Sequence, residues 1–85
     1  MTLPDTFFEI SIPEQCRILY LEGEFMMAIR YYKYKVNLYL LGDKYVEVFY
    51  NHKFDRIHKI QELDYNSSRI NFYIDQINIT ELLDV

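Results

Sequence analysis

Cysteine, glycine and proline are scarce in this sequence, and tryptophan does not occur. The single cysteine, Cys16, has no partner for an intramolecular disulfide and excludes a zinc ribbon built on cysteine pairs. With only Gly23 and Gly42, the chain has no glycine-rich phosphate loop of the dinucleotide-binding or Walker type. Cys16 falls on the predicted apolar side of a helix, where a free cysteine packs as a small hydrophobic residue. We therefore expect no cofactor and no metal centre.

Long hydrophobic runs are absent as well. The apolar stretches are a few residues long and are interrupted by Arg30, Lys33 and Lys35, whereas a membrane-spanning helix needs roughly 20 apolar residues. Residues 1–10 lack the basic start and apolar run of a signal peptide. We expect a cytoplasmic protein that does not enter a membrane. Phe, Tyr, Met, Ile, Asn and Lys fill 38 of the 85 positions, as a gene biased toward A and T would produce, so the number of tyrosines is weak evidence for a ligand. We expect a prokaryotic protein.

The sequence does contain enough apolar material for one modest core. Hydrophobic residues make up 51% of the chain, and no linker or repeat divides them, so residues 1–85 are expected to form a single domain. Ser11 and Glu14 fit a helix-capping box, and apolar residues then recur at a 3.6-residue spacing from Ile12 to Tyr20. Gly23 stands where a left-handed cap would end the helix. The spacing predicts a helix over residues 12–22.

From Phe25 to Phe54, apolar and aromatic residues recur about every second position, which is the period of a β-strand. Gly42-Asp43 is the one clear turn in this region. A second turn is placed near Lys33-Tyr34, because an uninterrupted strand would be unusually long. The pattern predicts strands over residues 25–32, 35–41 and 44–50. In the third strand, the residues expected to point inward are Val46, Val48 and Tyr50, and those expected outward are Tyr45, Glu47 and Phe49.

Residues 55–64 fit neither a clean strand nor a convincing helix, because their apolar residues are three positions apart. We favour a fourth, edge strand, since the charged residues of this segment would discourage pairing with another chain. Beyond a polar break at 64–68, apolar residues from Ile70 to Ile77 form a helical stripe. The expected fold is α+β: an antiparallel meander sheet of three to four strands, with an N-terminal and a C-terminal helix on one face.

The net charge of -4 is unevenly distributed. Residues 25–61 contain seven basic and three acidic residues, whereas residues 1–24 and 62–85 each contain one basic and five acidic residues. Two interpretations stay open: the acidic end segments lie near a basic sheet, or the sheet presents an anion-binding face.

The outer face of the predicted sheet gathers aromatic side chains beside basic ones. Tyrosine and arginine are favoured at the centres of protein interfaces. The same mixture can stack unpaired nucleotides and neutralise phosphates, although the chain lacks the signature motifs of RNA-recognition and KH domains. Tyrosine is also a good strand former, so a sheet gathers it without any ligand. The candidate binding residues are Arg30, Tyr32, Lys35, Tyr39, Tyr45 and Phe49.

His52, Asp55 and His58 are three positions apart and could offer two imidazoles and a carboxylate to a metal, with Glu47 as a further ligand. A loop that runs into an edge strand would splay these side chains apart, so two exposed histidines are the simpler interpretation. No nucleophile motif or close carboxylate pair accompanies them. We expect that the protein is not an enzyme.

Three hypotheses follow, in order of preference. The first is a small non-enzymatic module that binds another protein or associates with itself as a homodimer. The alternative is single-stranded nucleic-acid binding by the basic, tyrosine-rich sheet face. The third is a metal-dependent hydrolase that uses His52, Asp55 and His58.

Overall fold

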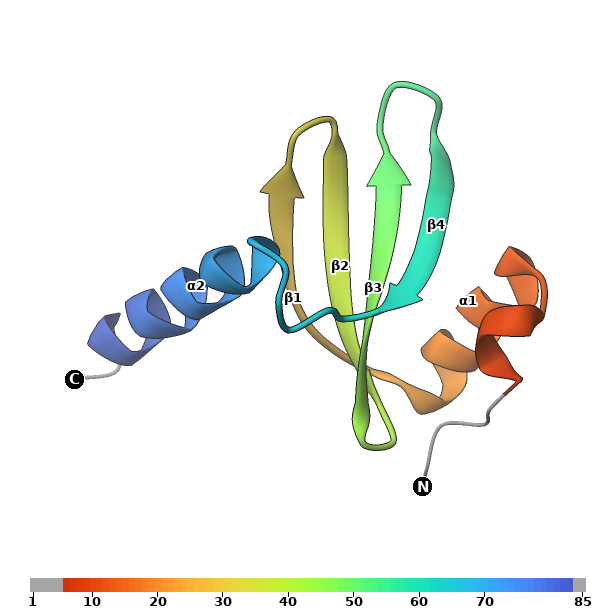
Figure 1. The fold of residues 1–85 in the computed structure, drawn as a ribbon, viewed down its shortest axis with the longest axis horizontal. Coiled ribbons are helices and arrows are strands. Elements are labelled where there is room, and N and C mark those ends of the chain that lie inside the picture. The colour runs from red at the N-terminus through yellow and green to blue at the C-terminus, as the bar shows by residue number, and fades with distance from the viewer. Residues whose placement is uncertain (1–5, 84–85) are drawn as a thin grey trace.

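A computed structural model describes the backbone of residues 6–83 and the side chains of residues 6–76. It confirms an α+β meander, in which four antiparallel strands form one open sheet in the order β1-β2-β3-β4 (Figure 1). The edges of the sheet are β1 and β4, so the prediction of a fourth, edge strand is confirmed. The elements in chain order are η1 (Phe7–Glu9), α1 (Ile12–Glu22), β1 (Glu24–Tyr31), β2 (Tyr34–Leu41), β3 (Lys44–Asn51), β4 (Arg56–Glu62) and α2 (Arg69–Leu83).

Helix α1 begins and ends where the sequence predicts. The Ser11 side-chain oxygen accepts a hydrogen bond from the Glu14 N–H at 3.3 Å, which satisfies one free donor of the first turn. At the other end, the Gly23 N–H donates to the Leu19 carbonyl at 2.9 Å. Gly23 has φ -85°, so the expected left-handed cap is wrong. Glycine is needed there for space, because a Cβ would lie 2.7 Å from the Leu19 carbonyl oxygen.

The register of the hairpins decides which side chains share a face. Around the Gly42-Asp43 turn, Leu41 pairs with Lys44, and further along Val36 lies opposite Phe49. Side chains alternate along a strand, so Phe49 points to the same face as Val36, and the neighbouring Val48 points to the other.

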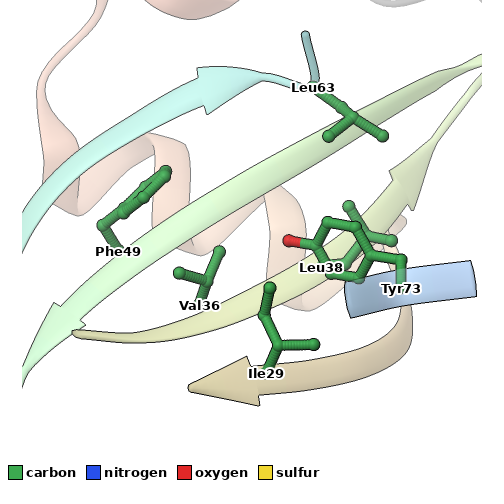
Figure 2. Packing of buried hydrophobic residues seen from close by; sticks show 6 residues of the cluster. All are labelled: Ile29, Val36, Leu38, Phe49, Leu63 and Tyr73. Atoms are coloured by element: carbon green, nitrogen blue, oxygen red, sulfur yellow. The ribbon is translucent and has the colours of Figure 1, made fainter. Parts of the chain in front are cut away.

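One face of the sheet, called here the α2 face, packs against the beginning of α2. Its buried cluster consists of Ile29, Val36, Leu38, Phe49, Leu63 and Tyr73 (Figure 2). Tyr73 comes from α2, so this helix covers the face on which Val36 and Phe49 lie.

The opposite face, called the α1 face, packs against η1 and α1. Its buried cluster consists of Phe7, Leu19, Leu41, Val46 and Val48. The two helices therefore lie on opposite faces of the sheet, and the expectation that both share one face is wrong. The physical reason is that the strands carry apolar side chains on both faces, and each face needs a cover.

Figure 1 shows that α2 meets the sheet only near its first turns and then projects beyond β1. Within the described part of the chain, no helix combines the length and apolar character needed to span a bilayer.

Candidate binding surfaces

The structure divides the six predicted binding residues among three places. Three of them lie on the α1 face, two lie on the α2 face, and one lies in the turn between β1 and β2. In that order they are Arg30, Lys35 and Tyr39; Tyr45 and Phe49; and Tyr32.

Phe49 and Tyr45 do not take part in an open platform with Tyr39. Phe49 is 2% exposed and lies under two cations: its ring centre is 4.6 Å from the Lys59 ammonium and 5.1 Å from the Arg69 guanidinium carbon. Tyr45 is half-buried and packs against the cluster under α2. The prediction that these two rings point outward beside Tyr39 is therefore wrong, because Tyr39 pairs with Val46 and shares its face.

Tyr32 stands at the tip of the first hairpin, which turns through Tyr32-Lys33, one residue earlier than predicted. It is 84% exposed and has φ 57°, a left-handed conformation that is uncommon for a bulky residue. Its ring makes an edge contact with Tyr31 at 4.7 Å. Tyr32 is thus available to a partner but is separated from the other predicted residues.

The part of the α1 face next to the first hairpin is open and basic, because Arg30 and Lys35 are both exposed there. Arg30 lies directly opposite Lys35, and Lys35 lies opposite Tyr50 on the next strand. Arg30 and Lys35 line a hollow of about 320 Å³ together with Ala28 and His52. Neither cation forms an ion pair with any residue that the structure describes.

Next to this hollow, a groove of about 370 Å³ runs between α1 and the sheet. The Phe25 and Tyr39 rings meet edge to face at 5.6 Å on its sheet side. The Tyr50 hydroxyl donates to the Asp55 carboxylate, and this bond, with burial and the nearby negative charge, raises the pKa of Tyr50. The polar and aromatic groups of the lining are Cys16, Tyr20, Phe25, Asn37, Tyr39 and Tyr50.

Burial raises the pKa of the Cys16 thiol at the wall of this groove. A raised pKa keeps the sulfur protonated at neutral pH, and a thiol in this form is a weak nucleophile and a poor metal ligand. Cys16 therefore contributes to the groove as a small apolar group.

The α2 face contains a polar group that the sequence did not reveal. Glu47 is fully buried, and its two carboxylate oxygens accept hydrogen bonds from Arg69 Nε at 2.8 Å and Arg69 Nη2 at 2.9 Å. The Tyr73 hydroxyl donates to the same carboxylate at 2.8 Å. We call these three residues the Glu47 network. It joins β3 to α2 and leaves no described buried side-chain polar atom without a partner.

The pKa values of this network reflect its contacts. Burial, followed by the hydrogen bond to Glu47, raises the pKa of Tyr73 far above its ordinary value. The hydrogen bonds to Glu47 raise the pKa of Arg69. Both groups therefore stay protonated throughout the neutral range, so neither Arg69 nor Tyr73 can serve as a general acid or base there.

An apolar groove of about 190 Å³ lies between β1 and the beginning of α2. Three partly exposed side chains on its rim form what we call the β1–α2 patch: Met26 at 38%, Tyr65 at 63% and Ile74 at 46% exposure. The predicted residue Tyr45 lies in its wall. All the residues that line this groove are apolar or aromatic.

The two histidines do not converge with Asp55. The His52 ring meets Tyr50 edge to face at 4.9 Å, whereas His58 stacks on Tyr34 at 5.2 Å on the opposite face of the sheet. Among the described residues, no cluster of three or more histidine, cysteine or acidic side chains could hold a metal ion. The geometry therefore gives no support to the hydrolase hypothesis.

Comparisons of the chain with protein-family models, with curated proteins and with solved structures found no match.

Proposed function

We propose that this protein is a non-enzymatic module that binds through protein contact and associates first of all with a second copy of itself. The observation that supports the proposal is the β1–α2 patch, where Met26, Tyr65 and Ile74 surround an apolar groove. Neighbouring exposed apolar groups are characteristic of interaction surfaces, because covering them releases water from apolar area.

The patch also suits contact between identical surfaces. In a two-fold dimer the same residues meet from both chains, so a charged patch would face its own sign. The lining of this groove carries no formal charge and therefore avoids such repulsion. The neighbouring strand β1 is a sheet edge, whose outer backbone groups can pair with another strand.

Light scattering after size-exclusion chromatography tests this proposal. The wild-type chain is expected to form a concentration-dependent dimer near twice 10.4 kDa. Ile74→Asp should give a monomer, because it places a charge in the apolar interface. Leu21→Asp is the matched control, since it places the same charge on an exposed apolar residue of α1, and it should leave the dimer intact. A wild-type monomer at every concentration would refute self-association.

A second function, single-stranded nucleic-acid binding, is favoured by one specific observation. Arg30, Lys35 and Tyr39 share the α1 face, so basic and aromatic groups stand side by side there. Titration with a labelled thymidine octamer at two salt concentrations tests it, because phosphate contacts release counterions and weaken steeply as salt rises. Binding that is absent or insensitive to salt would refute this function.

A further inference from the structure

The strongest unexplained feature of the molecule is the pair of cations on the α1 face. Arg30 and Lys35 lie directly opposite each other on adjacent strands. Like charges in this arrangement destabilise a sheet, and no described acidic residue pairs with either of them. His52 lines the same hollow and adds a third nitrogen donor. A bound anion would relieve the repulsion, and this arrangement favours one at this place.

Aromatic side chains begin immediately beside the cations. Tyr50 is the cross-strand neighbour of Lys35, and Asn37 and Tyr39 follow Lys35 along the same face of β2. Adjacent strands are about 4.8 Å apart, and residues two apart along a strand are about 7 Å apart. The groove lined by Asn37, Tyr39 and Tyr50 therefore starts within one side-chain length of the cation pair.

We propose that this surface is a site for one nucleotide unit, with the phosphate at Arg30 and Lys35 and the base in the groove beside Tyr39 and Tyr50. The proposal rests on the second function above and narrows it to a defined place and ligand. The guanidinium of Arg30 has the fork geometry that matches phosphate oxygens. Aromatic side chains stack bases of any sequence, and the Asn37 amide can both donate to and accept from a base edge.

The acidic groups on the α1 face determine which end of the nucleotide lies at the cations and which lies in the groove. Asp55 holds the Tyr50 hydroxyl, and the Glu62 carboxylate belongs to the cross-strand row that contains Tyr39 and Val46. A phosphate placed in that row would be repelled by the Glu62 carboxylate. At Arg30 and Lys35 the same phosphate is attracted by two cations. The base therefore points toward Tyr39 and the phosphate toward the first hairpin.

Two-dimensional NMR titration of the full chain tests the site, with adenosine monophosphate as the probe and adenosine and inorganic phosphate as its parts. Adenosine monophosphate is expected to shift the signals of Asn37 and Tyr39 and to bind about tenfold more tightly than either part, because one stacked base contributes roughly that factor. The double variant Arg30→Ala/Lys35→Ala should weaken it by about tenfold or more. Lys44→Ala removes an exposed cation at the other end of the sheet and should leave affinity unchanged.

Ring removal tests the other half of the site. Tyr39→Leu keeps apolar bulk but removes the stacking surface, and it should weaken adenosine monophosphate about tenfold. Phe72→Leu removes an exposed ring of α2, on the opposite side of the sheet, and is the control that should leave the affinity unchanged. Circular dichroism of each variant separates a loss of binding from a loss of folding. Inorganic phosphate binding as tightly as adenosine monophosphate, or an unchanged affinity in the double variant, would overturn the site.

The thymidine octamer distinguishes the two sources of a nucleotide. Octamer binding that weakens in Arg30→Ala/Lys35→Ala supports a site for a unit within a strand. Binding of adenosine monophosphate without the octamer supports the site for free nucleotides and rejects the nucleic-acid function. Octamer binding that is unchanged in the double variant overturns the site but still agrees with the nucleic-acid function. If neither ligand binds, both the site and the nucleic-acid function are refuted.

Discussion

The two faces of the sheet hold their helices in different ways. On the α1 face, Phe7 and Leu19 pack on Val46 and Val48 in an apolar contact, and the buried Gln15 amide of α1 donates to the Phe7 carbonyl at 3.0 Å. On the α2 face, the apolar cluster surrounds a buried carboxylate that Arg69 and Tyr73 bind. Apolar packing tolerates changes of volume to some degree, whereas a buried ion pair fails when one partner is lost. We infer that apolar packing holds α1 on the sheet and that the buried Glu47–Arg69 ion pair holds α2.

Replacing Arg69 is the strongest way to separate the two faces. Arg69→Met is expected to lower the free energy of unfolding by about 3–5 kcal/mol, because it leaves the fully buried Glu47 carboxylate without a counterion. Urea denaturation followed by circular dichroism measures this loss. The triple variant Glu47→Leu/Arg69→Met/Tyr73→Phe removes the whole network and should recover most of the stability. A loss below about 1 kcal/mol in the single variant would show that apolar packing alone holds α2.

A substitution that creates a cavity on the α1 face is expected to give the next largest loss of stability. Leu19→Ala is expected to lower the free energy of unfolding by about 2–5 kcal/mol, because Leu19 is 3% exposed and packs against the sheet. Leu21→Ala, at an exposed position of the same helix, should change it by no more than about 0.5 kcal/mol. Equal losses in the two variants, measured in urea, would contradict apolar packing as the attachment of α1.

The close approach of Gly23 to the Leu19 backbone gives a further test of how α1 is attached to the sheet. Gly23→Ala forces a Cβ toward the Leu19 backbone oxygen and is expected to lower the free energy of unfolding by about 1–3 kcal/mol. Glu22→Ala, at the preceding exposed residue, is the control. Thermal unfolding monitored by circular dichroism compares them, and an unchanged midpoint in Gly23→Ala would show that the chain between α1 and β1 can shift freely.

Alkaline pH should affect the α2 face through Tyr73. Its pKa is raised above the ordinary 10.0, so the folded chain keeps a proton that the unfolded chain releases. Stability is therefore unaffected by Tyr73 below about pH 10 and falls above it, with a slope of up to about 1.4 kcal/mol per pH unit from this residue. Tyr73→Phe should reduce the slope measured by urea denaturation between pH 9 and 11, whereas Tyr65→Phe removes an exposed hydroxyl and should not. Identical slopes in Tyr73→Phe and the wild type would contradict the raised pKa.

Local signals in the sequence predicted the elements of this fold well. The cap at Ser11 and the spacing after it placed α1 at Ile12–Glu22, and the alternation placed the first three strands within one residue at each end. These signals act within a few residues, where propensity and capping dominate. The turn between β1 and β2 was misplaced by one residue because Tyr32 adopts a left-handed φ that glycine or asparagine usually supplies.

The candidate site was only half predicted, because it depends on pairing between strands. A two-residue turn at Gly42-Asp43 pairs an even-numbered residue of β2 with an odd-numbered residue of β3, as Val36 pairs with Phe49. Applying this rule to the sequence would have separated Tyr39 from Tyr45 and Phe49. Arg30, Lys35 and Tyr39 stayed together because moving the turn of their hairpin by one residue shifts the pairing by two residues, which keeps every side chain on its face.

The Glu47 network was missed for a different reason. Arg69 is 22 residues from Glu47 in sequence, and no local pattern links them. The available signal was an acidic residue between apolar neighbours in a central strand, because such a residue is rarely buried without a partner. A search for a cation in the last helix would then have pointed to Arg69, the only basic residue of the segment 62–85.

The agreement between strand order and sequence order has a consequence for how the chain folds. Each strand pairs only with its neighbours along the chain, so the sheet forms by closing short loops, at a small cost in chain entropy. The Glu47–Arg69 contact spans a longer loop and joins α2 to a sheet that is already complete. We expect it to form after the rate-limiting step. Arg69→Met should then accelerate unfolding and leave the folding rate nearly unchanged in stopped-flow measurements, so the contact that fixes α2 would govern how long the folded state persists.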